Sequence, residues 1–144
     1  MENDKRYQPR GIDYFWIRHQ ENVTRLDSVE VKTDTWDTGN LYLELVANEE
    51  REKPGWLYTS EAQWLSYVVL PQSRMYLVPF PELREWYRRS VYTQKSFWKR
   101  TFTGNREGGY HSWGVPCPIT DILRETTHRE VDIGIWLNEE LRLA

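Results

Sequence analysis

Two apolar stretches near the N-terminus have the pattern of neighbouring β-strands. Residues 12–17 form an apolar and aromatic run, and residues 25–32 alternate between polar and apolar side chains, as a strand with one buried face does. Residues 19–22 between them are polar and suited to a tight connection. We therefore expect the two stretches to pair as an antiparallel hairpin.

The alternation of the second strand assigns its side chains to two faces. Glu30 and Lys32 fall on one face, and Val29 and Val31 fall on the other, which we expect to enter the core. If the strands pair antiparallel, Asp13 at the start of the first strand lies beside Glu30. The sequence thus predicts two carboxylates and an exposed lysine that converge at one edge of a sheet.

These residue types are the ones that a magnesium site requires. Mg²⁺ takes oxygen ligands in an octahedron and keeps several waters, so Asp13, Glu30 and the carbonyl of Val31 would be a sufficient protein contribution. Such an ion lowers the pKa of a bound water and stabilises charge on a phosphoryl oxygen. Lys32 could orient that water, help to deprotonate it or neutralise the developing charge. The choice depends on the pKa of Lys32, which the pattern leaves open.

Alternation returns after this hairpin. In residues 41–46 leucines alternate with other side chains, which predicts a third strand with Glu44 on the face away from the leucines. Residues 61–69 predict a helix that places Gln63 and Tyr67 one turn apart on a common face. There the two side chains could hold a metal-bound water or a phosphate. The alternative is that Tyr67 is half-buried core and Gln63 an exposed helix residue.

The second half of the chain predicts further short elements. They are a strand, a helix begun by prolines, a short helix, a last strand or irregular segment and a terminal turn (residues 75–78, from 79–82 onward, 119–123, 131–136 and 138–141). Residues 93–110 lack a clear period and predict a long mobile loop.

A basic and aromatic segment lies between Arg84 and Arg106. It holds seven basic residues and one acid, Glu85, for a local balance of +6, although the whole chain has a net charge of −3. Its candidate nucleic-acid contacts are Arg88, Arg89, Lys95, Lys99 and Arg100. Cations supply the phosphate-directed part of nucleic-acid binding, and aromatic side chains stack on unpaired bases. The alternative is that the aromatics belong to the core and the cations to a solvated face. Core is our expectation for Trp86 and Tyr87, and both interpretations stay open for residues 95–106.

Composition limits the other possibilities. A chain of 144 residues suits one domain with a core of its own. It contains no apolar run long enough to span a bilayer and no signal-peptide pattern, so we expect a cytoplasmic protein without membrane contact. The single cysteine, Cys117, excludes an intramolecular disulfide framework, and the scattered His19, His111 and His128 do not have the spacing of a zinc site.

Taken together, these motifs resemble those of the PD-(D/E)XK, or restriction-endonuclease-like, nuclease superfamily. Gly11-Ile12-Asp13 is similar to the entry of its first strand, and Glu30-Val31-Lys32-Thr33-Asp34 to its second. With Thr38-Gly39-Asn40 and Glu44, the pattern resembles a subgroup of small, mostly uncharacterised phage and bacterial proteins. Gln63-Trp64-Leu65-Ser66-Tyr67 is similar to the Gln-x-x-x-Tyr helix of the RecB-type and lambda-exonuclease-like branch. The resemblance covers roughly residues 10 to 80.

The resemblance implies a fold, an activity and a cofactor. The fold would be α/β, with a restriction-endonuclease-like core in which helices flank a central mixed sheet of four to five strands. The activity would be hydrolysis of phosphodiester bonds, in DNA rather than RNA, with Mg²⁺ or Mn²⁺ as a substitute. Asp13, Glu30 and Lys32 would be catalytic, the first two with Val31 would hold the metal, and Gln63, Tyr67 and Glu44 would support the site.

One departure from the family's pattern keeps a second interpretation open. Nucleases of this type usually begin with a helix before the first strand, but only ten mostly polar residues precede Gly11. We expect that leading helix to be absent or reduced, and a homodimer or a partner chain to cover the gap. The alternative function is a catalytically inactive fold that binds nucleic acid or serves in assembly.

Overall fold

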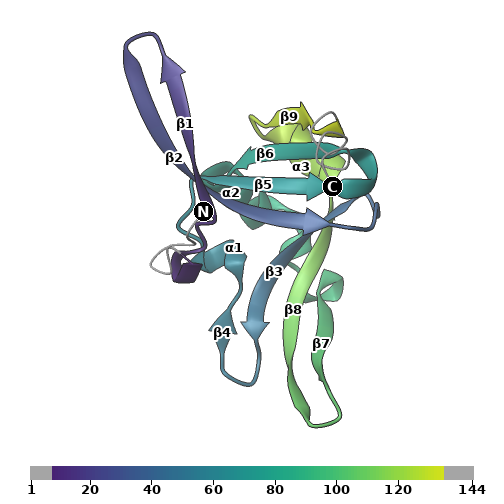
Figure 1. The fold of residues 1–144 in the computed structure, drawn as a ribbon. Coiled ribbons are helices and arrows are strands. Elements are labelled where there is room, and N and C mark those ends of the chain that lie inside the picture. The colour runs from purple at the N-terminus through teal and green to yellow at the C-terminus, as the bar shows by residue number, and fades with distance from the viewer. Residues whose placement is uncertain (1–7, 135–144) are drawn as a thin grey trace.

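Two β-sheets make up most of the molecule (Figure 1), and the structure, a computed structural model, describes residues 8–134. The first sheet has five strands in the order β1-β2-β5-β6-β9. β2 and β5 pair in parallel, and the other neighbours in this sheet pair antiparallel. The strands are β1 (Tyr14–Gln20), β2 (Val23–Asp34), β5 (Trp64–Val69), β6 (Arg74–Pro79) and β9 (Arg129–Asp132).

The second sheet is antiparallel and has four strands in the order β4-β3-β8-β7. Its strands are β3 (Asn40–Asn48), β4 (Lys53–Pro54), β7 (Lys99–Asn105) and β8 (Gly108–Pro118). In Figure 1 the β1–β2 hairpin and the β7–β8 hairpin extend from the body of the molecule in different directions.

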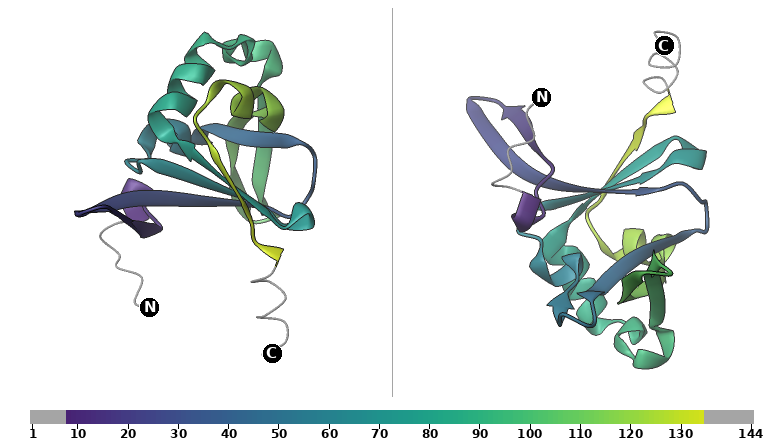
Figure 2. Two further views of the ribbon diagram at one scale, coloured as in Figure 1. Left: turned by 90° about the horizontal axis from the view of Figure 1, so that it is seen from above. Right: turned by 60° about the horizontal axis from the view of Figure 1, so that its bottom comes forward.

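The longer helices lie on one face of the first sheet (Figure 2). The α-helices are α1 (Trp56–Thr59), α2 (Phe80–Arg89) and α3 (Ile119–Glu125), and the short 3₁₀ helices η1 to η4 are Gln8–Arg10, Leu70–Gln72, Val91–Thr93 and Lys95–Phe97. Between residues 8 and 134, no helix is both long enough and apolar enough to cross a membrane.

One hydrophobic core joins the two sheets and these helices. β3 contributes Leu41, Leu43 and Leu45, β5 contributes Leu65, and α2 contributes Phe80, each almost completely buried. The alternation of leucines along β3 turns one face of the second sheet toward the first sheet. The expected α/β architecture with a mixed five-stranded sheet is therefore confirmed, whereas the second sheet is an addition to it.

The short elements predicted after residue 70 are mostly confirmed. Residues 75–78 lie in β6, α2 starts at the expected prolines, and residues 119–123 lie in α3. The last predicted strand overlaps β9, which ends at Asp132, and the turn expected at residues 138–141 lies outside the described residues. Ahead of β1 the structure describes the 3₁₀ turn η1, and the remainder of the expected leading segment also lies outside them.

The helix expected over residues 61–69 is wrong, because residues 64–69 form strand β5. Leu65, Tyr67 and Val69 face the core, and Ser66 between them is buried as well. A central strand that is covered on both faces has no clear polar side, so its pattern can be mistaken for a buried helix.

The loop expected over residues 93–110 is also wrong. Most of this segment forms η4, β7 and the start of β8, with a turn at residues 106–107. Every residue of β7 is exposed. An edge strand without a buried face shows no hydrophobic alternation, which explains why the sequence pattern missed it.

Val29 on β2 is buried as expected, but the face of β2 that carries Glu30 is covered as well. In the parallel register, Glu30 lies opposite Leu65 and Lys32 opposite Tyr67, and both β5 residues belong to the core. Glu30 is 3% exposed, while Val29 is buried on the other face of the sheet. Both faces of this part of β2 are covered, so alternation alone could not tell which one meets the core.

Replacement of a core leucine tests this arrangement. Leu65→Ala should lower the free energy of unfolding by about 2–5 kcal/mol, because it leaves a cavity in the core. Leu26→Ala, the same change at a β2 side chain that is 58% exposed, should change it by less than about 0.5 kcal/mol. Chemical denaturation measures both, and equal losses would contradict the assignment of Leu65 to the core.

Candidate functional site

Asp13 lies directly before β1 and is tied to β2 by two hydrogen bonds. Its backbone N–H donates to the carbonyl of Val29 (2.8 Å), and its Oδ2 accepts the N–H of Val31 (2.6 Å). Since Tyr14 pairs with Val29, Asp13 stands beside Glu30, as the sequence predicts. The N–H and C=O of one strand residue point to the same edge, so the carbonyl of Val31 faces the side on which Asp13 lies.

Glu30 brings a carboxylate into the interior. Its Oε1 lies 2.7 Å from the Nζ of Lys32. Its Oε2 is buried as well and has no hydrogen-bond partner in the described part of the chain. Gly11 leaves room for this oxygen, because a Cβ at residue 11 would come within 2.8 Å of it. A buried carboxylate oxygen without a partner is costly in free energy, and a bound cation would offset that cost.

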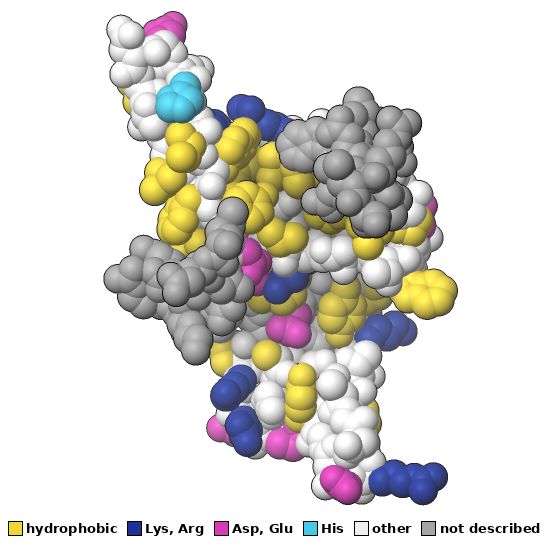
Figure 3. Space-filling model, viewed as in Figure 1, with side chains coloured by type: hydrophobic (Ala, Val, Ile, Leu, Met, Phe, Trp, Pro, Cys, Tyr) yellow, Lys and Arg dark blue, Asp and Glu magenta, His cyan; other side chains and the backbone are white. Residues whose placement is uncertain are grey.

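Lys32 lies at the mouth of this interior site. Its side chain, expected to be exposed, is 36% exposed, and its Nζ lies over the ring of Trp56, 5.5 Å from the centroid. Trp56 begins α1, and its N–H donates to the Oε1 of Glu44 (3.3 Å). A chain of contacts thus links Glu30 on β2 to Glu44 on β3. Figure 3 shows acidic and basic side chains gathered near the middle of this face, where β2 and β3 come together in Figure 1.

Arg84 on α2 is a second cation in the neighbourhood of Glu30. Its guanidinium donates to the carbonyl of Leu57 (2.7 Å) and to that of Ser60 (2.5 Å). Burial lowers the pKa of Arg84, and the charge of Glu30 opposes that shift. The sequence placed Arg84 in the basic segment, but nothing in its spacing indicated that it comes near Glu30. Trp56 was missed for the same reason, because both contacts depend on tertiary packing.

Gln63 and Tyr67 do not join this site in the structure. The Oε1 of Gln63 accepts the N–H of Ser28 (2.9 Å). The hydroxyl of Tyr67 lies 2.8 Å from both the Oδ2 of Asp34 and the carbonyl of Asn40. Burial, together with the charge of Asp34, raises the pKa of Tyr67. These hydrogen bonds join Gln63 to β2 and Tyr67 to β2 and β3, and they do not reach Asp13 or Glu30.

The basic candidates fall into paired and unpaired cations. Arg88 and Arg89 on α2 share one partner, Glu85. Arg100 on β7 pairs with Glu49 (2.6 Å). Lys95 and Lys99 are exposed, and among the described residues neither has an ion pair. The positive balance of this segment is therefore partly neutralised.

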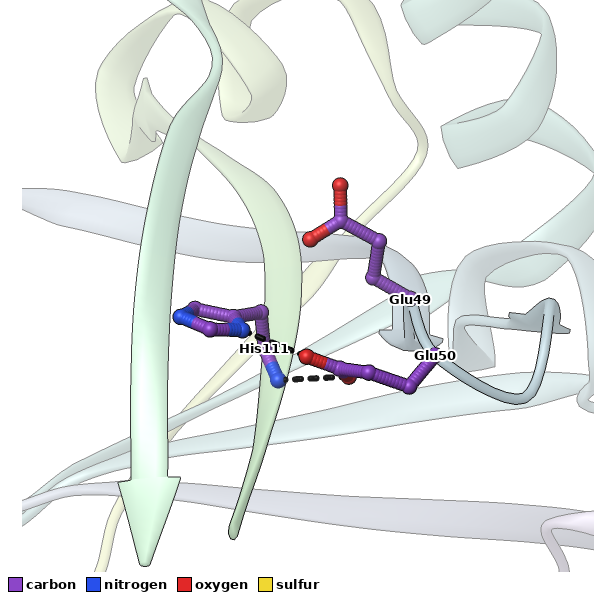
Figure 4. Close-up of side chains that lie close together, drawn as sticks. All are labelled: Glu49, Glu50 and His111. Carbon is purple, nitrogen blue, oxygen red and sulfur yellow. Dashed lines mark hydrogen bonds and ion pairs between the residues drawn. The ribbon is translucent and has the colours of Figure 1, made fainter.

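A second cluster of ionisable groups ties the β3–β4 connection to β8. Oxygens of Glu49 and Glu50 and the Nδ1 of His111 lie within 4.8 Å of one another (Figure 4). Both oxygens of Glu50 are engaged by His111, one by Nδ1 (2.5 Å) and one by the backbone N–H (2.9 Å). Glu49 is engaged by Arg100. These ligand atoms already have partners. We therefore interpret Glu49, Glu50 and His111 as a structural contact, the clamp, that joins the β3–β4 connection to β8.

Comparisons with protein-family models, with curated proteins and with solved structures found no match for this chain. A functional assignment therefore depends on the geometry of the chain's own residues.

The clamp predicts a pH dependence of stability. Hydrogen bonds from His111 lower the pKa of Glu50 to about 2, below the value of about 4.3 for an unfolded chain. The contribution of Glu50 is therefore complete above that unfolded pKa and is lost as the pH falls through about 2. Glu50→Gln should lower the melting temperature at neutral pH, and the difference from wild type should shrink as the pH falls through this window.

Glu52→Gln is the matched control, because Glu52 is exposed in the same connection and has no ion pair in the described part of the chain. Thermal melts of the three proteins across this pH range measure the effect. A difference between Glu50→Gln and wild type that stays constant with pH would refute the clamp.

Proposed function

We propose that this protein is a metal-dependent nuclease that hydrolyses phosphodiester bonds in DNA. One observation carries the proposal: a carboxylate, Glu30, is 3% exposed and keeps one oxygen without a hydrogen bond, next to Asp13 and Lys32. Structural carboxylates that are buried this far normally have all their oxygens paired. A group of oxygen atoms that includes one without a hydrogen bond suits a hard divalent cation.

The protein ligands of that cation are Asp13, Glu30 and the carbonyl of Val31. Asp13 uses one carboxylate oxygen for the N–H of Val31, and its other oxygen is the one assigned to the metal. A Mg²⁺ ion, or Mn²⁺ in its place, supplies Lewis acidity and a water of lowered pKa when bound.

Lys32 positions the attacking water and balances the developing negative charge. Trp56 and Glu30 hold its ammonium group from two sides, which limits the directions in which it can donate. Glu44 belongs to the site through the N–H of Trp56. Arg84 adds a second positive charge in the neighbourhood of Glu30.

The restriction-endonuclease-like fold, the DNA substrate and the cytoplasmic setting belong to the same proposal. The mixed first sheet, with Glu30 on β2 and Asp13 directly before the adjacent strand β1, supports the fold. The exposed Lys95 and Lys99, with Arg88, Arg89 and Arg100, are the candidate phosphate contacts. A second copy of the chain or another partner is proposed to cover the N-terminal side of the site.

The alternative is a catalytically inactive fold that binds nucleic acid or takes part in assembly. The close ion pair of Lys32 with Glu30 favours it, because the pair neutralises itself without a metal. An assay of DNA cleavage distinguishes the two functions, because the alternative function allows the protein to bind DNA without cutting it.

Lys32→Ala should reduce cleavage of DNA in Mg²⁺ by at least about a hundredfold, because it removes the group that positions the water. Arg25→Ala is the control, since it removes a positive charge from an exposed site on the same strand. It should cleave at the rate of the wild type. Gel assays of cleavage, with circular dichroism to verify folding, provide the measurement.

Cleavage by Lys32→Ala at the wild-type rate would refute the role of Lys32. A wild-type protein that binds DNA and never cuts it in Mg²⁺ or Mn²⁺ would favour the alternative function.

A further inference from the structure

A cavity of about 690 Å³ lies beside the second sheet, and neither Asp13 nor Glu30 lines it. Leu45, which follows Glu44 along β3, is one of the residues that line it. Val46 lines it as well, at the β-bulge that interrupts the pairing of β3 with β8 between Glu44 and Val46. The volume of the cavity is in the range of pockets that enclose small organic ligands.

Aromatic side chains form the walls of this cavity. Trp98 and Trp113 meet edge to face, with centroids 6.5 Å apart and an angle of 62° between the planes. The indole N–H of Trp98 donates to the carbonyl of Tyr92 (3.3 Å), which satisfies its polar end and leaves the ring for contact. Tyr58 on α1 is a further wall and is 56% exposed. Such walls suit a flat aromatic ligand, because stacked and edge contacts between rings are favourable.

The charges at the cavity favour an anion. Lys53 and Lys95 line it, both are exposed, and among residues 8–134 neither has an ion pair. Of the two acids that line it, Glu49 is engaged by Arg100, and this contact lowers the pKa of Glu49. Two free ammonium groups therefore face one free carboxylate, Glu52.

We propose that this cavity is a nucleotide-binding site. The base packs against Trp98, Trp113 and Tyr58, and the phosphate binds to Lys53 and Lys95. The same chemistry fits a free nucleotide and an unpaired nucleotide of a single strand. The site goes beyond the proposed cleavage, because it requires neither the metal nor Glu30.

Titration of the protein with adenosine monophosphate in the presence of EDTA tests the proposal. Tryptophan fluorescence or calorimetry should detect binding, and adenosine, which lacks the phosphate, should bind about tenfold more weakly because charge-assisted hydrogen bonds are lost. Single-stranded oligodeoxyadenylate provides the second arm. Tighter binding of the oligonucleotide indicates a strand as the natural ligand, and tighter binding of the monophosphate indicates a free nucleotide.

Lys95→Ala should weaken binding of the monophosphate by about tenfold. Arg51→Ala is its control, because Arg51 is an exposed cation that does not line the cavity, and it should bind as the wild type does. Trp98→Ala should weaken both the monophosphate and adenosine, with Trp36→Ala, an exposed tryptophan outside the cavity, as control.

Absence of binding by the wild type, or equal affinities of Lys95→Ala and Arg51→Ala, would overturn the proposal. The outcome is independent of cleavage: a protein that binds the nucleotide and never cuts DNA would refute the nuclease function alone. A protein that cuts DNA and ignores the nucleotide would refute this site alone.

Discussion

The burial of the Glu30 carboxylate is the constraint on which the rest of this structure depends. Parallel pairing of β2 with β5 turns Glu30 toward the core, opposite Leu65. An ionised group in that position needs partners, and Lys32, two residues along the same face, supplies one of them. Loss of one partner from a buried ion pair typically costs about 3–5 kcal/mol, and the partial exposure of Lys32 reduces that figure through solvent screening. The proposed metal site depends on this burial of Glu30.

The second sheet brings the remaining parts of the site to this charge. β3 carries Glu44, and α1 is bound to it at Gly55, where a Cβ would overlap the Glu44 carbonyl. This close approach places the N–H of Trp56 on Glu44 and the ring of Trp56 under Lys32. The same strand therefore contributes Leu41, Leu43 and Leu45 to the core and Glu44 to the contact with Trp56.

The sequence predicted the pairing of Asp13 with Glu30 and missed the contacts that depend on tertiary packing. Asp13 and Glu30 were expected side by side because hairpin pairing is local, and the structure places them so. The direction of Glu30 was wrong, since alternation cannot tell which of two covered faces is the core. The pattern of residues 61–69 predicts a helix because β5 is covered on both faces and has no clear polar side.

Other features of the structure produce no local pattern in the sequence. The exposed edge strand β7 has no buried face and hence no hydrophobic period. Arg84 comes near Glu30 only because α2 packs on the first sheet, and sequence spacing does not encode that contact. The clamp between Glu50 and His111 joins residues that are 61 positions apart.

X-ray diffraction from crystals soaked in Mn²⁺ tests the central claim most directly. The account predicts an anomalous peak within coordination distance of Asp13, Glu30 and the carbonyl of Val31, with the Nζ of Lys32 displaced toward the bound water. A fully occupied manganese peak elsewhere in the molecule, with the pair of Glu30 and Lys32 unchanged, would contradict it.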